Sequence, residues 1–162
     1  MALRFLLLAL VGTVLSPSTP SPTSQSGAPY QITDVRVQLF YSREGTFSGN
    51  LVGTPNMNSL WNTVIGAGQG GGASSATLVV VEVSGQPGSY AGESSVDLAV
   101  RGEKKEILHR RQRLDVLSGK GKGYIGFWLY DTGCEPLRVS AKLVGKTKSS
   151  PVNVEIPFRC GE

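Results

Sequence analysis

Apolar and polar residues alternate at every second position along most of this chain, and that pattern restricts its fold more than any other feature. A period of two predicts β-strands that bury one face, and no segment holds the apolar period of an amphipathic helix. Thr77–Val83 is β-branched almost throughout, which predicts a strand buried on both faces. The clearest alternating segments are Val35–Tyr41, Val96–Val100, Leu137–Leu143 and Val152–Phe158.

Weaker strands are expected at Phe47–Val52, Leu60–Ile65 and Glu106–Leu117. The 21 glycines and 9 prolines among 162 residues are typical of many short strands joined by turns. About eight or nine such strands predict an all-β fold, a single antiparallel β-sandwich that is immunoglobulin-like or related. One flat sheet of that width would expose too much apolar surface. The expected domain spans residues 30–162.

The first residues have the pattern of a secretory signal peptide. One positive charge at Arg4 precedes eleven residues, Phe5–Leu15, that are apolar apart from a glycine and a threonine, and small residues follow. This run is shorter than the ~20 apolar residues of a membrane span, and no later run is longer, so no integral membrane span is expected. We expect a signal peptide over residues 1–18, with cleavage between 18 and 26, and a Pro/Ser/Thr-rich disordered leader over 19–29. The mature chain is therefore expected to be secreted or periplasmic.

An even pair of cysteines in an exported chain predicts a disulfide between Cys134 and Cys160. Each lies thirteen residues from Thr147, so a hairpin centred there would bring the two cysteines opposite each other. The bridge would stabilise the domain by roughly 3 kcal/mol through loop closure. It differs from the inter-sheet bridge of antibody domains, because Trp128 precedes both cysteines. His109 is the only histidine, so no metal site is expected.

Positive charge is concentrated in the second half of the domain. Arg101–Lys148 contains twelve Lys and Arg residues against five Asp and Glu residues. Within it Arg110, Arg111 and Arg113 belong to a strand that is polar on both faces. A protruding hairpin with these arginines would bind an anionic surface, a glycan or a nucleic acid. The alternative is a solvated edge strand whose charges prevent sheet-to-sheet aggregation.

Aromatic residues gather on one face of the segment Gly123–Asp131. Its odd-numbered apolar positions, Ile125, Phe127 and Leu129, are expected to face the core. The other face carries Tyr124, Trp128 and Tyr130, with Gly126 opening space between the first two. Exposed aromatic rings on a sheet face can stack on sugar rings or bind a protein partner. The alternative is a central strand whose second face is covered by Thr54–Ser75, with Trp61 packing there.

No cofactor or catalytic residue is predicted. Gly66–Gly71 fits the glycine pattern of dinucleotide sites, but a β-branched strand follows where that site needs a helix, so no dinucleotide is expected. His109 has a basic neighbourhood that disfavours the protonated imidazole of a general base, and it is expected to be a strand surface residue. The acids are dispersed along the sequence: Asp34, Glu44, Asp97, Asp115, Asp131 and Glu135.

These patterns favour a secreted or periplasmic, non-enzymatic β-sandwich that acts as a binding or accessory surface module. Its partner would be a glycan, a protein or an anionic surface. Two alternatives remain open. One is a carbohydrate-active or other hydrolase module whose site is assembled from dispersed acids. The other is a structural component of an envelope or matrix.

Overall fold

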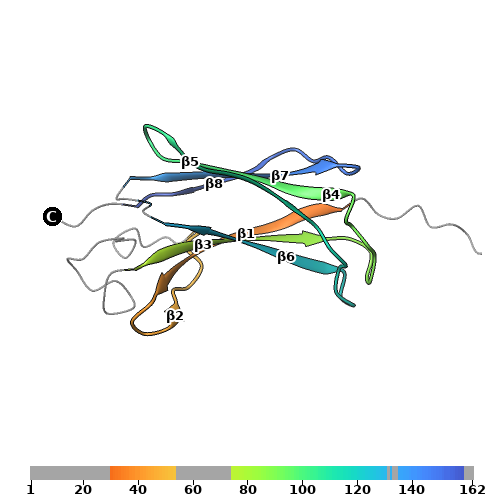
Figure 1. Cartoon of the computed structure of the whole chain (residues 1–162), viewed down its shortest axis with the longest axis horizontal. Helices are drawn as coiled ribbons and strands as arrows, with labels where there is room; N and C mark the ends of the chain where they lie inside the picture. Colours follow the sequence, from red (N-terminus) through yellow and green to blue (C-terminus); the bar gives the residue numbers. More distant parts are fainter. Residues whose placement is uncertain (1–29, 54–73, 131, 133–134, 159–162) are drawn as a thin grey trace, which may run out of the picture.

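The computed structural model describes residues 30–53, 74–130, 132 and 135–158 as two four-stranded antiparallel sheets packed face to face (Figure 1). In the first sheet the strand order is β2-β1-β3-β6, and in the second it is β5-β4-β7-β8. No helix occurs in these ranges, and hence none that could cross a membrane. The predicted all-β sandwich is confirmed. The strands are β1 (Gln31–Tyr41), β2 (Thr46–Phe47), β3 (Ala76–Ser84), β4 (Ser94–Arg101), β5 (Glu106–Arg113), β6 (Lys122–Leu129), β7 (Leu137–Gly145) and β8 (Val152–Ile156).

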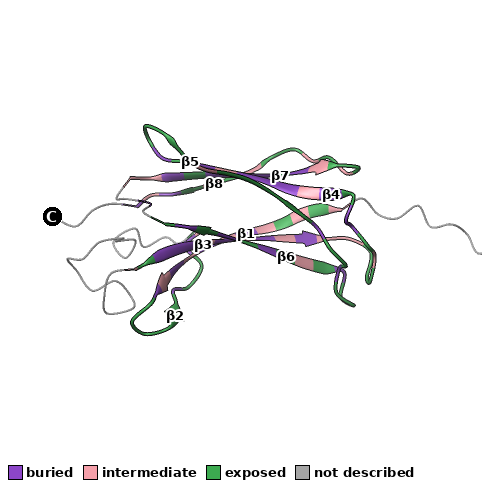
Figure 2. Ribbon diagram, viewed as in Figure 1, coloured by how far each residue is buried: buried purple, intermediate pink, exposed green. Residues whose placement is uncertain are grey.

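The core lies between the two sheets and is formed by the inward-facing side chains of both (Figure 2). Val37 and Val79 from the first sheet and Leu98 and Leu143 from the second are almost completely buried. Burial of each such side chain stabilises the fold by about 1.5–3 kcal/mol. These are the positions at which the sequence alternation predicts inward-facing residues.

β3 differs from its prediction on one face. Its inward residues Val79, Val81 and Val83 are fully buried, but Leu78 and Val80 on the outer face are only half-buried. The prediction of burial on both faces is therefore wrong. The physical reason is that the described outer face of this sheet carries only the side chains of neighbouring strands, and no second layer of described residues packs on it.

β2 is shorter than predicted, because side chains replace part of its ladder. It ends at Phe47, after which the Ser48 hydroxyl accepts a hydrogen bond from the Leu39 N–H (2.9 Å). The Asn50 side-chain oxygen accepts from the Val37 N–H (3.0 Å) in the same way. β5 also ends earlier than expected, at Arg113.

The chain crosses between the sheets three times, from β3 to β4, from β5 to β6 and from β6 to β7. The first two crossings meet where the Gly85 N–H donates to the Gly121 carbonyl (2.9 Å). Gly121 has a φ of +72°, and a side chain there would overlap the carbonyl oxygen of Gly85. Only glycine satisfies both conditions at this junction.

The pairing of β7 with β8 differs by one residue from the predicted hairpin. Leu137 pairs with Ile156 and Val139 pairs with Val154, whereas a hairpin centred on Thr147 would place Leu137 opposite Pro157. Directly paired residues share a face of the sheet, so a slip of one residue would put buried side chains opposite exposed ones. The apolar pattern, rather than the equal spacing of the cysteines, sets the register.

Several predictions concern residues outside the described ranges. They are the signal peptide over 1–18, the leader over 19–29, the strand Leu60–Ile65 with Trp61, the glycine-rich Gly66–Gly71 and the disulfide between Cys134 and Cys160. Each of them stays a prediction.

Candidate binding surface

Three aromatic residues meet on the outer face of the first sheet, and a fourth lies further along the same face. Phe40 of β1 contacts Phe47 of β2 and Trp128 of β6, with ring centroids 5.0 and 5.7 Å apart. Phe47 and Trp128 are 6.0 Å apart, which closes the triangle. Tyr124 lies on the same face of β6, four residues before Trp128. We call Phe40, Phe47, Tyr124 and Trp128 the aromatic face.

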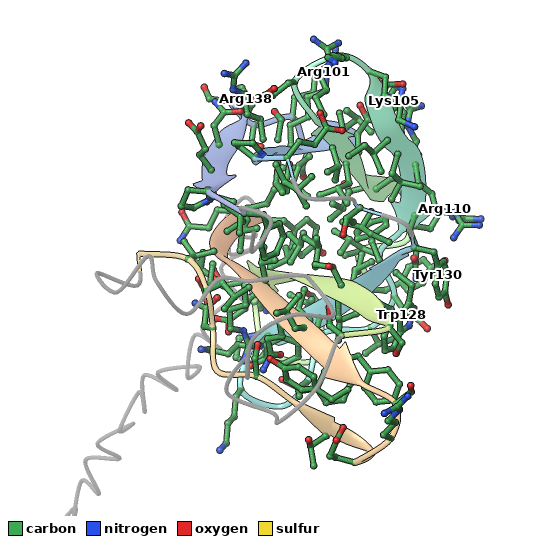
Figure 3. All side chains as sticks on the ribbon, turned by 90° about the vertical axis from the view of Figure 1, so that its left-hand side faces the viewer. Arg101, Lys105, Arg110, Trp128, Tyr130 and Arg138 are labelled. Atoms are coloured by element: carbon green, nitrogen blue, oxygen red, sulfur yellow. The ribbon has the colours of Figure 1, made fainter. Side chains whose placement is uncertain are left out.

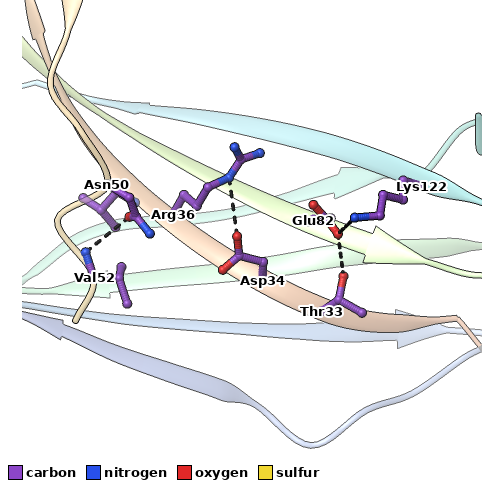
Figure 4. Close-up of polar contacts among 8 residues, drawn as sticks. Thr33, Asp34, Arg36, Asn50, Val52, Glu82 and Lys122 are labelled. Atoms are coloured by element: carbon purple, nitrogen blue, oxygen red, sulfur yellow. Dashed lines mark hydrogen bonds and ion pairs between the residues drawn. The ribbon is translucent and has the colours of Figure 1, made fainter. Parts of the chain in front are cut away.

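A cation fixes the Tyr124 end of the aromatic face. The Arg36 guanidinium lies over the Tyr124 ring, 5.5 Å from its centroid, and its Nε is 3.5 Å from Asp34 Oδ2 (Figure 4). A guanidinium over an aromatic ring is attracted by the negative ring face. The ring is therefore held in place while 55% of Tyr124 stays exposed.

An ion pair lies beyond Tyr124 on the same face. Lys122 Nζ is 2.8 Å from Glu82 Oε1, and the Thr33 hydroxyl donates to the same oxygen (3.1 Å, Figure 4). The hydrogen bond from Lys122 lowers the pKa of Glu82, and the same bond raises the pKa of Lys122. The aromatic face thus has a polar, charged border at this end.

The predicted aromatic residues are exposed. Trp128 is 39% and Tyr130 65% exposed, while Ile125, Phe127 and Leu129 are buried as predicted. The central position of the alternative is wrong among the described strands, because β6 lies at the edge of its sheet. The cover by Thr54–Ser75 with Trp61 falls almost wholly outside the described residues and stays a prediction.

Phe40 and Phe47 were not predicted as site residues. Phe40 occupies an even, outward position in the alternation of β1, so its exposure could have been inferred. Its contact with Trp128 depends on the order β1-β3-β6, which the local sequence does not specify.

The structure separates the three predicted arginines. Arg111 donates from Nε to Asp97 Oδ1 (3.3 Å), and the Arg113 guanidinium donates to the Gly92 carbonyl from both Nε (3.0 Å) and Nη2 (2.8 Å). Arg110 pairs with the inward-facing Leu98 and so lies on the opposite face of β5. Its guanidinium forms no hydrogen bond or ion pair with the part of the chain that the structure describes. The three arginines do not form one cluster.

Two of the basic residues of β5, His109 and Arg111, contact the same carboxylate, Asp97. Its side chain is only 9% exposed and lies 3.3 Å from His109 Nε2 and from Arg111 Nε, and 3.7 Å from Lys142 Nζ. His109 is an exposed strand residue, as predicted. These contacts join β5, β4 and β7 on the outer face of the second sheet.

A hollow of about 560 Å³ lies on that outer face. Arg101 and Arg138 pair directly across β4 and β7, and Figure 3 places both far from Trp128. This juxtaposition was not predicted, because it depends on the pairing of strands that are distant in the sequence. The hollow is lined by Ala99, Arg101, Arg138, Val139, Ser140, Asn153, Val154 and Glu155.

The dispersed acids contact separate partners. Asp115 accepts from the Val116 N–H (2.9 Å), and Glu135 accepts from the Glu103 N–H (2.8 Å). Asp131 lies outside the described residues. Within the described ranges no group of three or more His, Cys, Asp or Glu side chains could hold a metal ion.

No protein-family model matches this chain, and a search of curated proteins finds no match either. Functional inference therefore depends on the chemistry of these surfaces.

Proposed function

We propose that this chain is an exported, secreted or periplasmic, non-enzymatic binding module that recognises glycans through the aromatic face. The observation that carries the proposal is the exposed group of rings on the outer face of the first sheet. Water-exposed rings in contact with one another leave apolar surface unburied, and such patches mark binding sites.

The chemistry of the aromatic face favours a sugar. A sugar ring has an apolar C–H face that stacks on an aromatic ring, and hydroxyl groups at its rim that need polar partners. Polar side chains lie on the same face, with Arg36 beside Tyr124 and Gln38 on the strand between Arg36 and Phe40. Trp128 packs edge-on against Phe40, so little side-chain freedom is lost when a ligand binds.

We further propose that the sandwich is immunoglobulin-like. The order β1-β3-β6 corresponds to strands A, B and E of that fold, and β4-β7-β8 corresponds to strands C, F and G. In this assignment β5 adds an edge strand beside strand C, and the aromatic face lies on the outer side of the A-B-E sheet.

The hydrolase alternative needs two carboxylates that face one cleft. The described acids instead contact separate bases or backbone amides, which favours the binding module. The structural alternative predicts that no glycan binds.

A panel of soluble polysaccharides tests the proposal, with binding of every variant followed by calorimetry and that of wild type also by quenching of tryptophan fluorescence. Trp128→Ala should abolish binding of any polysaccharide that wild type retains, while lowering stability by less than the roughly 3–5 kcal/mol of a core tryptophan. Tyr90→Ala is the matched control, because Tyr90 is an exposed aromatic residue outside the aromatic face. Unchanged binding by Trp128→Ala, or no binding by wild type across the panel, would overturn the proposal.

A further inference from the structure

Among the described strands, four lie at sheet edges: β2 and β6 in the first sheet, β5 and β8 in the second. An unpaired edge presents backbone donors and acceptors to which another strand can add. Proteins usually block such edges with charges, prolines or very short strands. These four edges differ in whether they carry such protection.

Three of them are blocked. β2 is only two residues long. β5 carries a histidine and three arginines over His109–Arg113. β8 spans five residues between Pro151 and Pro157, neither of which can donate a backbone hydrogen bond.

β6 has no such protection. After its first residue, Lys122, whose charge pairs with Glu82, β6 contains no charged residue and no proline. It pairs with β3 over eight residues without a bulge, so it is a regular strand along its whole length. It is the one long edge among the described strands that lacks a device against strand addition.

The hydrogen bonds of the first sheet show which backbone groups of β6 face outward. Ser48 N–H donates to the Leu39 carbonyl, so the odd positions of this part of β1 face away from β3 and its even positions bond to β3. Because Gln38 pairs with Leu78, the even residues of β3 bond to β1, and its odd residues bond to β6. Since the odd residues of β3 pair with odd residues of β6, the odd residues of β6 bond to β3. The outward groups are therefore the N–H and C=O of the even residues: Tyr124, Gly126 and Trp128.

Lys122 confirms this direction. It is the first even residue of β6, and its carbonyl accepts from the Ser118 N–H (2.8 Å) on the side away from β3. Its own N–H donates to the Ser118 hydroxyl (3.1 Å). Beyond Lys122, no described residue bonds to the outward backbone groups of β6.

A positive charge lies beside this open edge. β5 contacts β6 across the two sheets, and Arg110 projects from β5 on its inner side. Figure 3 shows Arg110, Tyr130 and Trp128 along the same side of the molecule. A strand added to β6 would face Arg110 with its inner side chains and extend the aromatic face with its outer ones.

We infer that the β6 edge accepts an extended segment of a partner protein in which acidic and apolar side chains alternate. Its backbone would pair with Tyr124, Gly126 and Trp128, and its acidic side chains would meet Arg110. A second copy of this chain fits less well, because pairing β6 with β6 would bring two basic β5 strands together. This inference uses the backbone of β6 and does not depend on glycan binding.

The test uses a fluorescein-labelled peptide of ten alternating Glu and Val residues and measures fluorescence anisotropy. Gly126→Pro removes one outward donor and leaves the bonds to β3, because proline is tolerated where a strand N–H faces solvent. We expect Gly126→Pro to weaken binding about tenfold or more, whereas the matched control Gly126→Ala binds as wild type. The Arg110→Glu variant should no longer bind the Glu/Val peptide, and it should bind a peptide of ten alternating Lys and Val residues instead.

Amide hydrogen exchange of wild type gives a second measurement that needs no proline variant. The Glu/Val peptide should slow exchange at Tyr124, Gly126 and Trp128, and an N-methylated version of the peptide should not. The inference is overturned if wild type does not bind the Glu/Val peptide, if it binds the N-methylated peptide equally well, or if Gly126→Pro folds and binds unchanged. It is also overturned if light scattering shows a wild-type dimer that Gly126→Pro dissociates, since a second copy would then be the occupant.

Discussion

At the scale of single residues, one carboxylate organises the outer face of the second sheet. Asp97 is almost buried, and three basic side chains from two neighbouring strands converge on it. Sequence alone identified Asp97 only as one of several dispersed acids. Its partners on β5 and β7 could not be predicted, because the register that places them opposite Asp97 is a property of the folded sheet.

Asp97→Asn should therefore destabilise the domain. The substitution keeps the shape of the side chain but leaves His109, Arg111 and Lys142 without their shared negative charge. Because these partners are half-exposed, we expect a loss of about 1 kcal/mol in the free energy of unfolding. Urea denaturation measures it, with Glu155→Gln on the same sheet as the control. Equal stability of the two variants would show that the Asp97 contacts contribute nothing.

A second residue-scale prediction concerns pH. Lys122 lowers the pKa of Glu82 in the folded protein, so this carboxylate stabilises the fold above its ordinary pKa and loses that contribution as pH falls through the lowered value. Wild type should lose thermal stability below about pH 5 more steeply than Glu82→Gln does. Glu103→Gln, which changes an exposed acid with no ion pair among the described residues, is the control. Parallel pH profiles for wild type and Glu82→Gln would contradict this prediction.

At the scale of elements, the alternation in the sequence predicted the long strands and their buried faces. It failed where tertiary contacts decide the outcome. β2 is short because side-chain oxygens accept the hydrogen bonds of the β1 backbone N–H groups. For β6 the sequence left a central position open, whereas among the described strands β6 lies at the edge of its sheet. The aromatic rings of β6 were predicted from their spacing, but Phe40 and Phe47 join them only once strands that are far apart in sequence pair.

An element-scale prediction concerns the Ser48 hydroxyl, which takes the place of a backbone acceptor beside β1. Ser48→Ala removes the acceptor of the buried Leu39 N–H and should cost about 1–3 kcal/mol, the range for an unsatisfied buried donor. Hydrogen exchange at the Leu39 amide should accelerate more than at Val79 in the centre of β3. Ser75→Ala is the control, since its exposed hydroxyl donates to a carbonyl that also accepts from the Ser75 backbone N–H. If the Leu39 amide exchanges as in wild type, the Ser48 hydroxyl does not replace the β2 ladder.

At the scale of the whole molecule, the predicted disulfide would link the segment after β6 to the segment after β8. Replacing Cys134 and Cys160 with serine should lower the free energy of unfolding by roughly 2–4 kcal/mol and preserve the β-sheet signal in circular dichroism. Thiol titration of the native protein, expressed with export to an oxidising compartment, should find no free thiol. Two titratable thiols, or a melting temperature unaffected by reduction, would refute the bridge.

The three crossings between the sheets also determine when the molecule can fold. Ser94 pairs with Gly145, and Gln31 pairs with Ser84, so neither sheet can form from neighbouring residues alone. Pairings between distant residues slow folding, typically to milliseconds or seconds in β-sandwiches. The second sheet has to wait for β7 and β8, which are synthesised after the six other described strands. Such a delay would suit the export that we propose, and during it the β6 edge would be open to aggregation.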